Sequence, residues 1–220
     1  DPVQFVWRYA EPDDREVAGL VASALAYGNI RQIKKSVETV LAMLGDRPAR
    51  GVDRLDAGQA LLQLAGFKHR FNDSVDAVCL LVFIREMRRR AGSIERFFAP
   101  AAKGTKDLRS ALSEFVERTL DLPHGGLYGR GPLPPGAGVR FFFPSPRDGS
   151  ACKRLCLYLR WMVRADSVDP GGWTLVPRSS LLIPLDAHII RVSRSARLTR
   201  RVAPGWKMAE DITATLRACD

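Results

Sequence analysis

The sequence predicts an all-α protein. Apolar residues recur at intervals of three and four along most of the chain, which is the spacing of a helix face packed on a core. No segment shows the apolar and polar alternation of a half-buried strand, and no internal repeat is visible. The 220 residues are 46% hydrophobic and 26% charged. This length and composition suit one domain, over residues 1–220, with a substantial buried core.

Capping residues help to place the expected helices. Asp13 and Asp14 can cap the first helix, and Gly28 or Asn29 can end it in a left-handed turn. Ser93 can cap a short helix that follows the basic helix end Arg88-Arg89-Arg90, which we expect to be solvated. The expected helices are residues 13–25, 33–44, 55–64, 73–90, 93–98, 107–120, 150–164, 186–198 and 207–216.

Two linkers interrupt this helical pattern. Residues 121–148 are rich in proline and glycine and contain Phe141-Phe142-Phe143, and residues 165–184 contain Gly171-Gly172-Trp173. A loop as long as the first one inside a compact domain is usually either functional or disordered. The chain starts abruptly at Asp1 and ends at Asp220 directly after a helical pattern, which indicates a fragment of a longer protein.

The charge balance favours a polyanionic partner. Lysine and arginine outnumber aspartate and glutamate by 34 to 24, a net charge of +10, and neutralising phosphates would release counterions. A membrane partner is not expected, because no apolar run is long enough to span a bilayer and no terminal helix is basic and amphipathic.

The four cysteines do not indicate a metal centre. Cys79, Cys152, Cys156 and Cys219 form no CxxC pair, so neither a zinc ribbon nor an iron–sulfur loop is predicted. We expect no metal and no cofactor. Without a visible signal peptide, the plain expectation is reduced thiols in a cytoplasmic protein.

Two expected helix starts carry reactive groups. One is Gly149-Ser150-Ala151-Cys152-Lys153-Arg154, and the other is Ile183-Pro184-Leu185-Asp186-Ala187-His188-Ile189-Ile190-Arg191. Taken alone, Asp186 after a proline is most simply a helix N-cap, and Lys153 a solvated charge or a phosphate contact.

The segment around Asp186 resembles the aspartate segment of the helix-hairpin-helix DNA glycosylases, of which endonuclease III is the familiar member. In that superfamily an apolar residue, the catalytic aspartate, a small residue, a histidine and an Ile or Val precede an arginine. The paired glycines usual before the catalytic lysine are absent here, where Arg147-Asp148-Gly149-Ser150 stands instead. This irregular hairpin and the wide gap from lysine to aspartate resemble the archaeal 8-oxoguanine DNA glycosylases. The whole chain is also similar to an uncharacterised bacterial family of unknown function.

The resemblance implies a two-lobed helical fold with a cleft between the lobes. It also implies excision of a damaged base from double-stranded DNA, with AP lyase activity, by a monomer associated with the nucleoid. Lys153 would be the nucleophile and Asp186 the carboxylate that stabilises positive charge on the sugar. An oxidised purine such as 8-oxoguanine is the expected lesion. The competing hypothesis is a non-catalytic DNA- or RNA-binding helical module that keeps the fold without the chemistry.

Further residues are candidates for contact with DNA or with an extrahelical base, and each has a structural alternative. Asn29 can wedge into DNA or cap a helix; His69, Arg70 and Phe71 can read a flipped base, although Phe71 is equally a core candidate. For His188 we favour a structural role, in which its side chain holds the preceding loop to the helix. The candidates for phosphate contacts along the cleft rim are Arg147, Ser150, Lys153, Arg154, Arg191 and Arg194.

Overall fold

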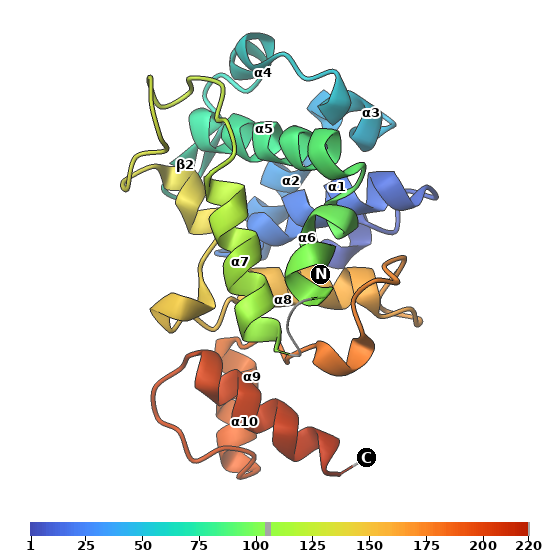
Figure 1. Cartoon of the computed structure of the whole chain (residues 1–220), viewed down its shortest axis with the longest axis vertical. Coiled ribbons are helices and arrows are strands. Elements are labelled where there is room, and N and C mark those ends of the chain that lie inside the picture. Colours follow the sequence, from blue (N-terminus) through green and yellow to red (C-terminus); the bar gives the residue numbers. More distant parts are fainter. Residues whose placement is uncertain (104–106, 220) are drawn as a thin grey trace.

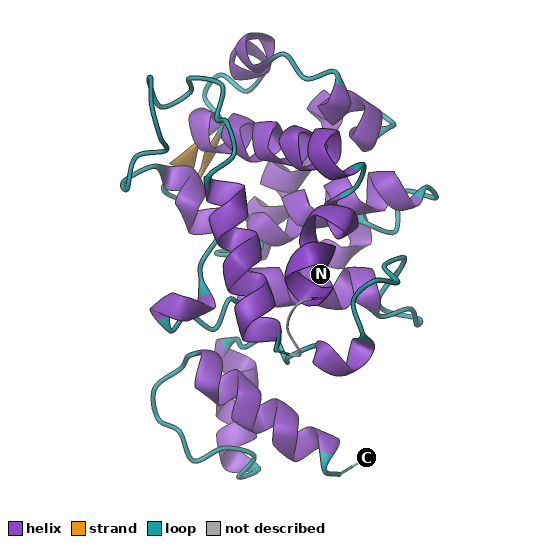
Figure 2. Cartoon of the chain, viewed as in Figure 1, coloured by secondary structure: helices purple, strands orange, loops and turns teal. Residues whose placement is uncertain are grey.

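The computed structural model describes residues 1–103 and 107–219, which are almost entirely helix and loop (Figure 2). The α-helices are α1 (Pro12–Ala24), α2 (Ile30–Leu44), α3 (Pro48–Asp53), α4 (Ala57–Gln63), α5 (Ser74–Ala91), α6 (Ile94–Lys103), α7 (Leu108–Leu120), α8 (Lys153–Val163), α9 (Ala187–Ser195) and α10 (Trp206–Arg217). Four 3-10 helices are η1 (Pro2–Phe5), η2 (Gly138–Phe142), η3 (Pro146–Asp148) and η4 (Arg178–Ser180). The strands β1 (Lys68–His69) and β2 (Asn72–Asp73) pair antiparallel. The all-α prediction is confirmed.

The main core surrounds α5 and α1. Residues 77–84 of α5 and 17–24 of α1 are buried on every side, as in helices enclosed by their neighbours. A second, small apolar cluster of Leu185, Met208, Ala209 and Ile212 joins α9 and α10. These two helices form a unit at one end of the molecule, drawn in red at the bottom of Figure 1.

Gly19 allows α1 and α8 to pack closely. A Cβ atom at Gly19 would lie 3.0 Å from Cε of Met162 and 3.1 Å from Cε2 of Tyr158. The Tyr158 hydroxyl also donates to the carbonyl of Glu16 at 3.2 Å. The position of α8, which begins with Lys153, is therefore set by the most deeply buried helices of the protein.

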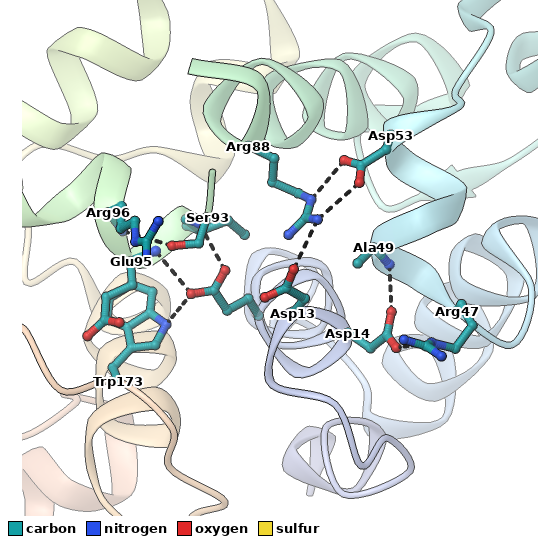
Figure 3. A network of polar contacts seen from close by, with 12 residues as sticks. Asp13, Asp14, Arg47, Ala49, Asp53, Arg88, Ser93, Glu95, Arg96 and Trp173 are labelled. Atoms are coloured by element: carbon teal, nitrogen blue, oxygen red, sulfur yellow. Dashed lines mark hydrogen bonds and ion pairs between the residues drawn. The ribbon is translucent and has the colours of Figure 1, made fainter. Parts of the chain in front are cut away.

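Two acidic residues early in α1, Asp14 and Glu16, cap other helices and not their own. The N-cap of α1 is Glu11, whose side chain makes no capping hydrogen bond, so the expectation that Asp13 or Asp14 caps α1 is wrong. The Asp14 carboxylate accepts from the backbone N–H of Ala49 at 2.9 Å, in the first turn of α3 (Figure 3). Because free N–H groups cluster at a helix start, a carboxylate from a neighbouring helix satisfies them equally well.

Glu16 performs the same function for α6. Its carboxylate accepts from the N–H groups of Ile94 at 2.9 Å and Glu95 at 3.0 Å, and from Nε1 of Trp173 at 2.7 Å. Burial raises the pKa of Glu16, while these three donors act in the opposite direction. Glu16 thus joins α1, α6 and the linker before α9 at one buried point.

Arg88 is not part of a solvated helix end. Its side chain is 8% exposed and donates to Asp53 at 2.8 Å and to Asp13 at 3.2 Å, as Figure 3 shows. These carboxylates raise its pKa. Arg89 and Arg90 are exposed as predicted. The helical periodicity placed all three arginines near the helix end but did not show that α1 and α3 lie over one of them.

The proline- and glycine-rich segment 121–148 is packed onto the start of α5. Asn72 Nδ2 donates to the carbonyl of Gly138 at 2.9 Å and to Asp76 Oδ2 at 2.7 Å, and the Tyr128 hydroxyl donates to the other Asp76 oxygen. Leu133 and Val139 are buried in the main core. This segment is therefore ordered, and it is not the disordered loop that was one of the two expected alternatives.

Replacing Gly138 by alanine should destabilise the protein. A Cβ atom there would overlap the buried carboxylate of Asp76, so either the loop or the α5 start must shift. We expect a loss of about 1–3 kcal/mol of unfolding free energy, in the range for overpacking, seen as a lower midpoint in urea. Gly136→Ala is the matched control, because its Cβ would meet nothing within 4 Å and should leave the midpoint almost unchanged. Equal midpoints for the two variants would contradict this account of the loop.

Within the part of the chain that the structure describes, none of the helices has the length and apolar character that crossing a bilayer requires.

Candidate functional site

Lys153 and Asp186, which are far apart in the sequence, lie side by side. Lys153 is the first residue of α8, and Asp186 is the N-cap of α9. Nζ of the lysine lies 4.0 Å from Oδ2 of the aspartate, with the two side chains 39% and 42% exposed. This separation is too long for a direct hydrogen bond, yet it allows both groups to approach one atom of a bound molecule.

The two oxygens of Asp186 have different neighbours. Oδ1 accepts from the backbone N–H of Ile189 at 2.7 Å and so caps α9, while Oδ2 faces Lys153. The capping bond holds the carboxylate in one orientation. The N-cap and the role beside a lysine are therefore compatible in one side chain.

The start of α10 holds these two helix starts together. Trp206 N donates to the carbonyl of Gly149 at 3.2 Å, and a Cβ atom on Gly205 would lie 2.8 Å from that oxygen. Ala151 packs against the small apolar cluster that α9 and α10 share. The segment that leads into Lys153 is thus docked on the same unit that carries Asp186.

The first turn of α8 starts three residues later than the sequence suggested. Its N-cap, Cys152, has a left-handed backbone with φ of 47°, and Ser150 Oγ accepts from the N–H of Cys152 at 3.1 Å. Ser150 therefore forms a turn before the helix, so its amide is not part of the helix start proposed to hold a phosphate. Burial raises the pKa of Cys152 to about 12, which keeps this thiol protonated next to Lys153.

Arg154 points into the protein instead of toward a cleft rim. It is 8% exposed and donates to the carbonyl groups of Ala24, at 3.2 Å, and Phe141. Its guanidinium carbon lies 3.9 Å from the ring centroid of Phe141 and 4.9 Å from that of Tyr27. Burial lowers its pKa to about 10, so the cation persists at neutral pH. No carboxylate pairs with it among the described residues. A phosphate would have to displace these contacts to reach it.

Three rings gather where the tip of the β1–β2 hairpin meets the two rings that contact Arg154. Tyr27, Phe71 and Phe141, named here the aromatic patch, have centroid separations of 4.4 Å (Phe71–Phe141), 4.8 Å (Tyr27–Phe141) and 5.6 Å (Tyr27–Phe71). Phe71 is 58% exposed and Phe141 is 38% exposed. Phe71 is therefore not a core residue, which was the alternative to a role in reading a flipped base.

Two of the other candidates near the patch have structural roles. His69 is buried, with its ring nitrogens 2.8 Å from Ser36 Oγ and 3.0 Å from the carbonyl of Tyr27, and burial lowers its pKa. Asn29 is exposed and caps α2 by accepting from Arg31 N at 2.8 Å; it does not cap the end of α1. Of the two, only Asn29 has a side chain at the surface.

Arg70 is at the hairpin tip, with φ of 58°, and its side chain lies over Gly28. A Cβ atom at Gly28 would come within 2.9 Å of Arg70 Cδ. The Tyr27–Asn29 turn and the hairpin tip therefore form one surface, which the sequence presented as two separate candidates.

The remaining candidates are exposed. Arg147 forms an ion pair with Glu117. His188 contacts Arg191, one turn along α9, at 3.2 Å between Nδ1 and Nη2, so it does not tie a loop to the helix as expected. Arg194 donates to the carbonyls of Arg201 and Val202.

A basic hollow beside Gly149 was not foreseen. It has a volume of about 450 Å³ and a mainly apolar lining, and its charged lining residues are Arg109, Lys207 and Arg201, which also pairs with Asp211. The three residues come from α7, the α9–α10 loop and α10, so no local sequence pattern would have grouped them. In the described residues, no cluster of three His, Cys, Asp or Glu side chains is arranged to hold a metal ion, and all four cysteines are free.

A family model matches the chain over residues 1–220, and its description is a protein of unknown function, DUF2400. Comparisons with curated proteins and with solved structures give no match.

Proposed function

The chain belongs to the DUF2400 family, and we propose that it is a DNA glycosylase with AP lyase activity that acts through Lys153 and Asp186. The observation that carries this proposal is the 4.0 Å approach of the lysine amine to the aspartate carboxylate from two separate helix starts. Both side chains are partly exposed, as groups that meet a macromolecular substrate must be. The resemblance of the Asp186 segment to the helix-hairpin-helix glycosylases supports the same chemistry.

In the proposed first step, the neutral amine of Lys153 attacks C1′ of the damaged nucleotide. The N-glycosidic bond breaks, its electron pair goes to the base, and the base leaves with a proton given up by the attacking nitrogen. Asp186 Oδ2 faces this point and stabilises the positive charge that builds up on the sugar. The capping bond to Ile189 orients the carboxylate in advance, so little reorganisation accompanies the reaction.

In the proposed second step, the bond between C1′ and the ring oxygen opens and the oxygen takes up a proton. The nitrogen and C1′ are then joined as a protonated Schiff base. Loss of a proton from C2′ forms a double bond to C3′ and expels the 3′ phosphate, which cuts the strand. An amine nucleophile is necessary for this sequence, because a hydroxyl group cannot form the imine.

The surroundings of the pair suit a DNA backbone. The basic hollow beside Gly149 places Arg109, Arg201 and Lys207 close to the segment that leads into Lys153. A second hollow of about 500 Å³ lies between Arg160 and Arg164 of α8 and Thr213 and Leu216 of α10. We propose that the substrate cleft of a two-lobed glycosylase follows this boundary between the main body and the α9–α10 unit.

The proposed substrate is duplex DNA with an oxidised purine such as 8-oxoguanine, on the basis of the resemblance to the archaeal enzymes. A base in the duplex must leave the stack before the amine can reach C1′, at a cost of a few kcal/mol. One observation favours a second candidate function. The Lys153–Asp186 contact is partly exposed and is also what an ordinary surface ion pair looks like, as in a non-catalytic nucleic-acid-binding module.

The two functions are separated by borohydride trapping on a panel of lesion-bearing duplexes. The glycosylase with lyase activity should give a covalent protein–DNA adduct with at least one lesion, together with a strand break when borohydride is omitted. Binding without adduct or cleavage across an extensive panel would support the module.

Affinity for duplex DNA should fall steeply with salt. If about five phosphates are neutralised, the affinity should fall by roughly 10²–10³ between 50 and 200 mM salt, because counterion release gives a linear log–log dependence. Lys207→Gln should make that slope shallower by about one unit, measured by fluorescence anisotropy. An affinity that hardly changes over this range would contradict a backbone-binding surface.

A further inference from the structure

We propose that the aromatic patch is a platform on which an unpaired nucleobase stacks, with the exposed ring of Phe71 as the contact. This inference rests on the proposed function in taking a DNA strand as the partner. It assigns a binding role to Tyr27 and Phe141, which the sequence did not place beside Phe71.

The Phe71 ring is held in place although it is largely exposed. It contacts the Phe141 ring in a T-shaped arrangement, at 4.4 Å and 85°, and the Tyr27 ring in a tilted one, at 5.6 Å and 30°. The hairpin tip that carries it is fixed by the β1–β2 pairing and by the buried ring of His69. An exposed ring that is already ordered loses little conformational freedom when a ligand covers it.

The rings below Phe71 are also fixed. The hydroxyl of Tyr27 donates to Asn72 Oδ1 at 2.5 Å and is 3.1 Å from the carbonyl of His69. Phe141 has the Arg154 guanidinium 3.9 Å from its centroid. Because Arg154 donates hydrogen bonds to the carbonyl groups of Ala24 and Phe141, it is a rigid support for the patch.

The charge around the patch favours a nucleotide over an apolar peptide. Arg70 precedes Phe71 at the hairpin tip, and Arg154 contacts the rings of Tyr27 and Phe141. Arg154 directly follows Lys153 in the first turn of α8, so the cation that contacts two rings of the patch is adjacent in sequence to the proposed nucleophile. A nucleotide, which joins a flat base to a phosphate, matches an exposed aromatic ring with the exposed cation Arg70 next to it.

The test compares binding of two short single strands, each of about 12 nucleotides, at fixed salt. One is oligothymidylate, and the other has the same backbone with tetrahydrofuran in place of every nucleoside, so it has neither bases nor a reactive aldehyde. Phe71→Ala should weaken binding of oligothymidylate by roughly 5- to 100-fold and leave the base-free strand unchanged. Phe71→Trp should retain the affinity, and Phe71→Leu should behave like alanine, because leucine is apolar but has no flat face.

Leu62→Ala is the control for removing an exposed apolar side chain, since Leu62 is 69% exposed on α4. It should change neither affinity. Equal weakening of both strands by Phe71→Ala, or no weakening of either, would overturn the platform. These outcomes do not depend on catalysis. If Phe71→Ala weakens only oligothymidylate binding and the parent traps no adduct, the platform is supported and the glycosylase proposal is rejected. If the parent traps an adduct but Phe71→Ala shows no base-specific loss, only the platform is rejected.

Discussion

Lys153→Gln should abolish borohydride trapping and reduce strand cleavage by at least about 1,000-fold, because an amide cannot form the Schiff base. Loss of a covalent nucleophile is among the largest single-residue effects known in enzymes. Glutamine is polar and only one atom shorter than lysine, and Lys153 is partly exposed at a helix start, so the fold should persist. The measurement is adduct formation on denaturing gels, with circular dichroism as the check on folding.

Lys207→Gln is the matched control for Lys153→Gln. Lys207 is an exposed lysine in the first turn of α10 and lines the basic hollow beside Gly149. Its loss should weaken phosphate-driven binding modestly and leave trapping intact at saturating protein. If Lys153→Gln cuts damaged DNA as well as the parent does, the proposed mechanism is wrong. Trapping that disappears only when another lysine is replaced would keep the class of enzyme and move the nucleophile.

Asp186→Asn should slow base release by at least about 100-fold, on the scale of losing one preorganised electrostatic group. The amide oxygen can still accept from Ile189 N, so the cap of α9 should remain and the loss of stability should be about 1 kcal/mol or less. Single-turnover kinetics with saturating protein measure the chemical step apart from binding.

A second substitution at this position separates capping from charge. Asp186→Ser keeps a capping oxygen but brings no group near Lys153 Nζ, so it should be as slow as the asparagine variant and about as stable. A serine or asparagine variant that releases base at the parent rate would show that the carboxylate only caps α9. Both variants should bind duplex DNA, since neither removes a cation.

Much of the fold could be predicted because its signals are local. The apolar spacing of α1, α2, α5 and α7 placed those helices within a few residues, and Ser93 accepts from the N–H of Arg96 at the start of α6, as a cap should. The short helix α3 and the two-residue strands of the hairpin were missed. Elements that short contain too few residues to show a period.

The candidate site was only partly predictable. The segment around Asp186 and the lysine of α8 were identified from their motifs, but their 4.0 Å approach depends on α10 docking against Gly149. Arg154 and Lys153 are adjacent basic residues in the sequence, and nothing there indicates that one is buried under two rings and the other faces solvent. Likewise, Phe141-Phe142-Phe143 does not show which ring is exposed.

The sequence by itself determined the helical class, the positive charge and the two helix starts that carry Lys153 and Asp186. Only the tertiary structure decided which carboxylates of α1 cap α3 and α6, which arginines are buried, and that Tyr27, Phe71 and Phe141 share one surface. The reason is the range of the interactions involved. Helix periodicity and capping connect residues within about four positions, so they can be predicted from short stretches of sequence. Burial and side-chain pairing depend on which distant helix packs against each residue, and that is settled only when the whole core is assembled.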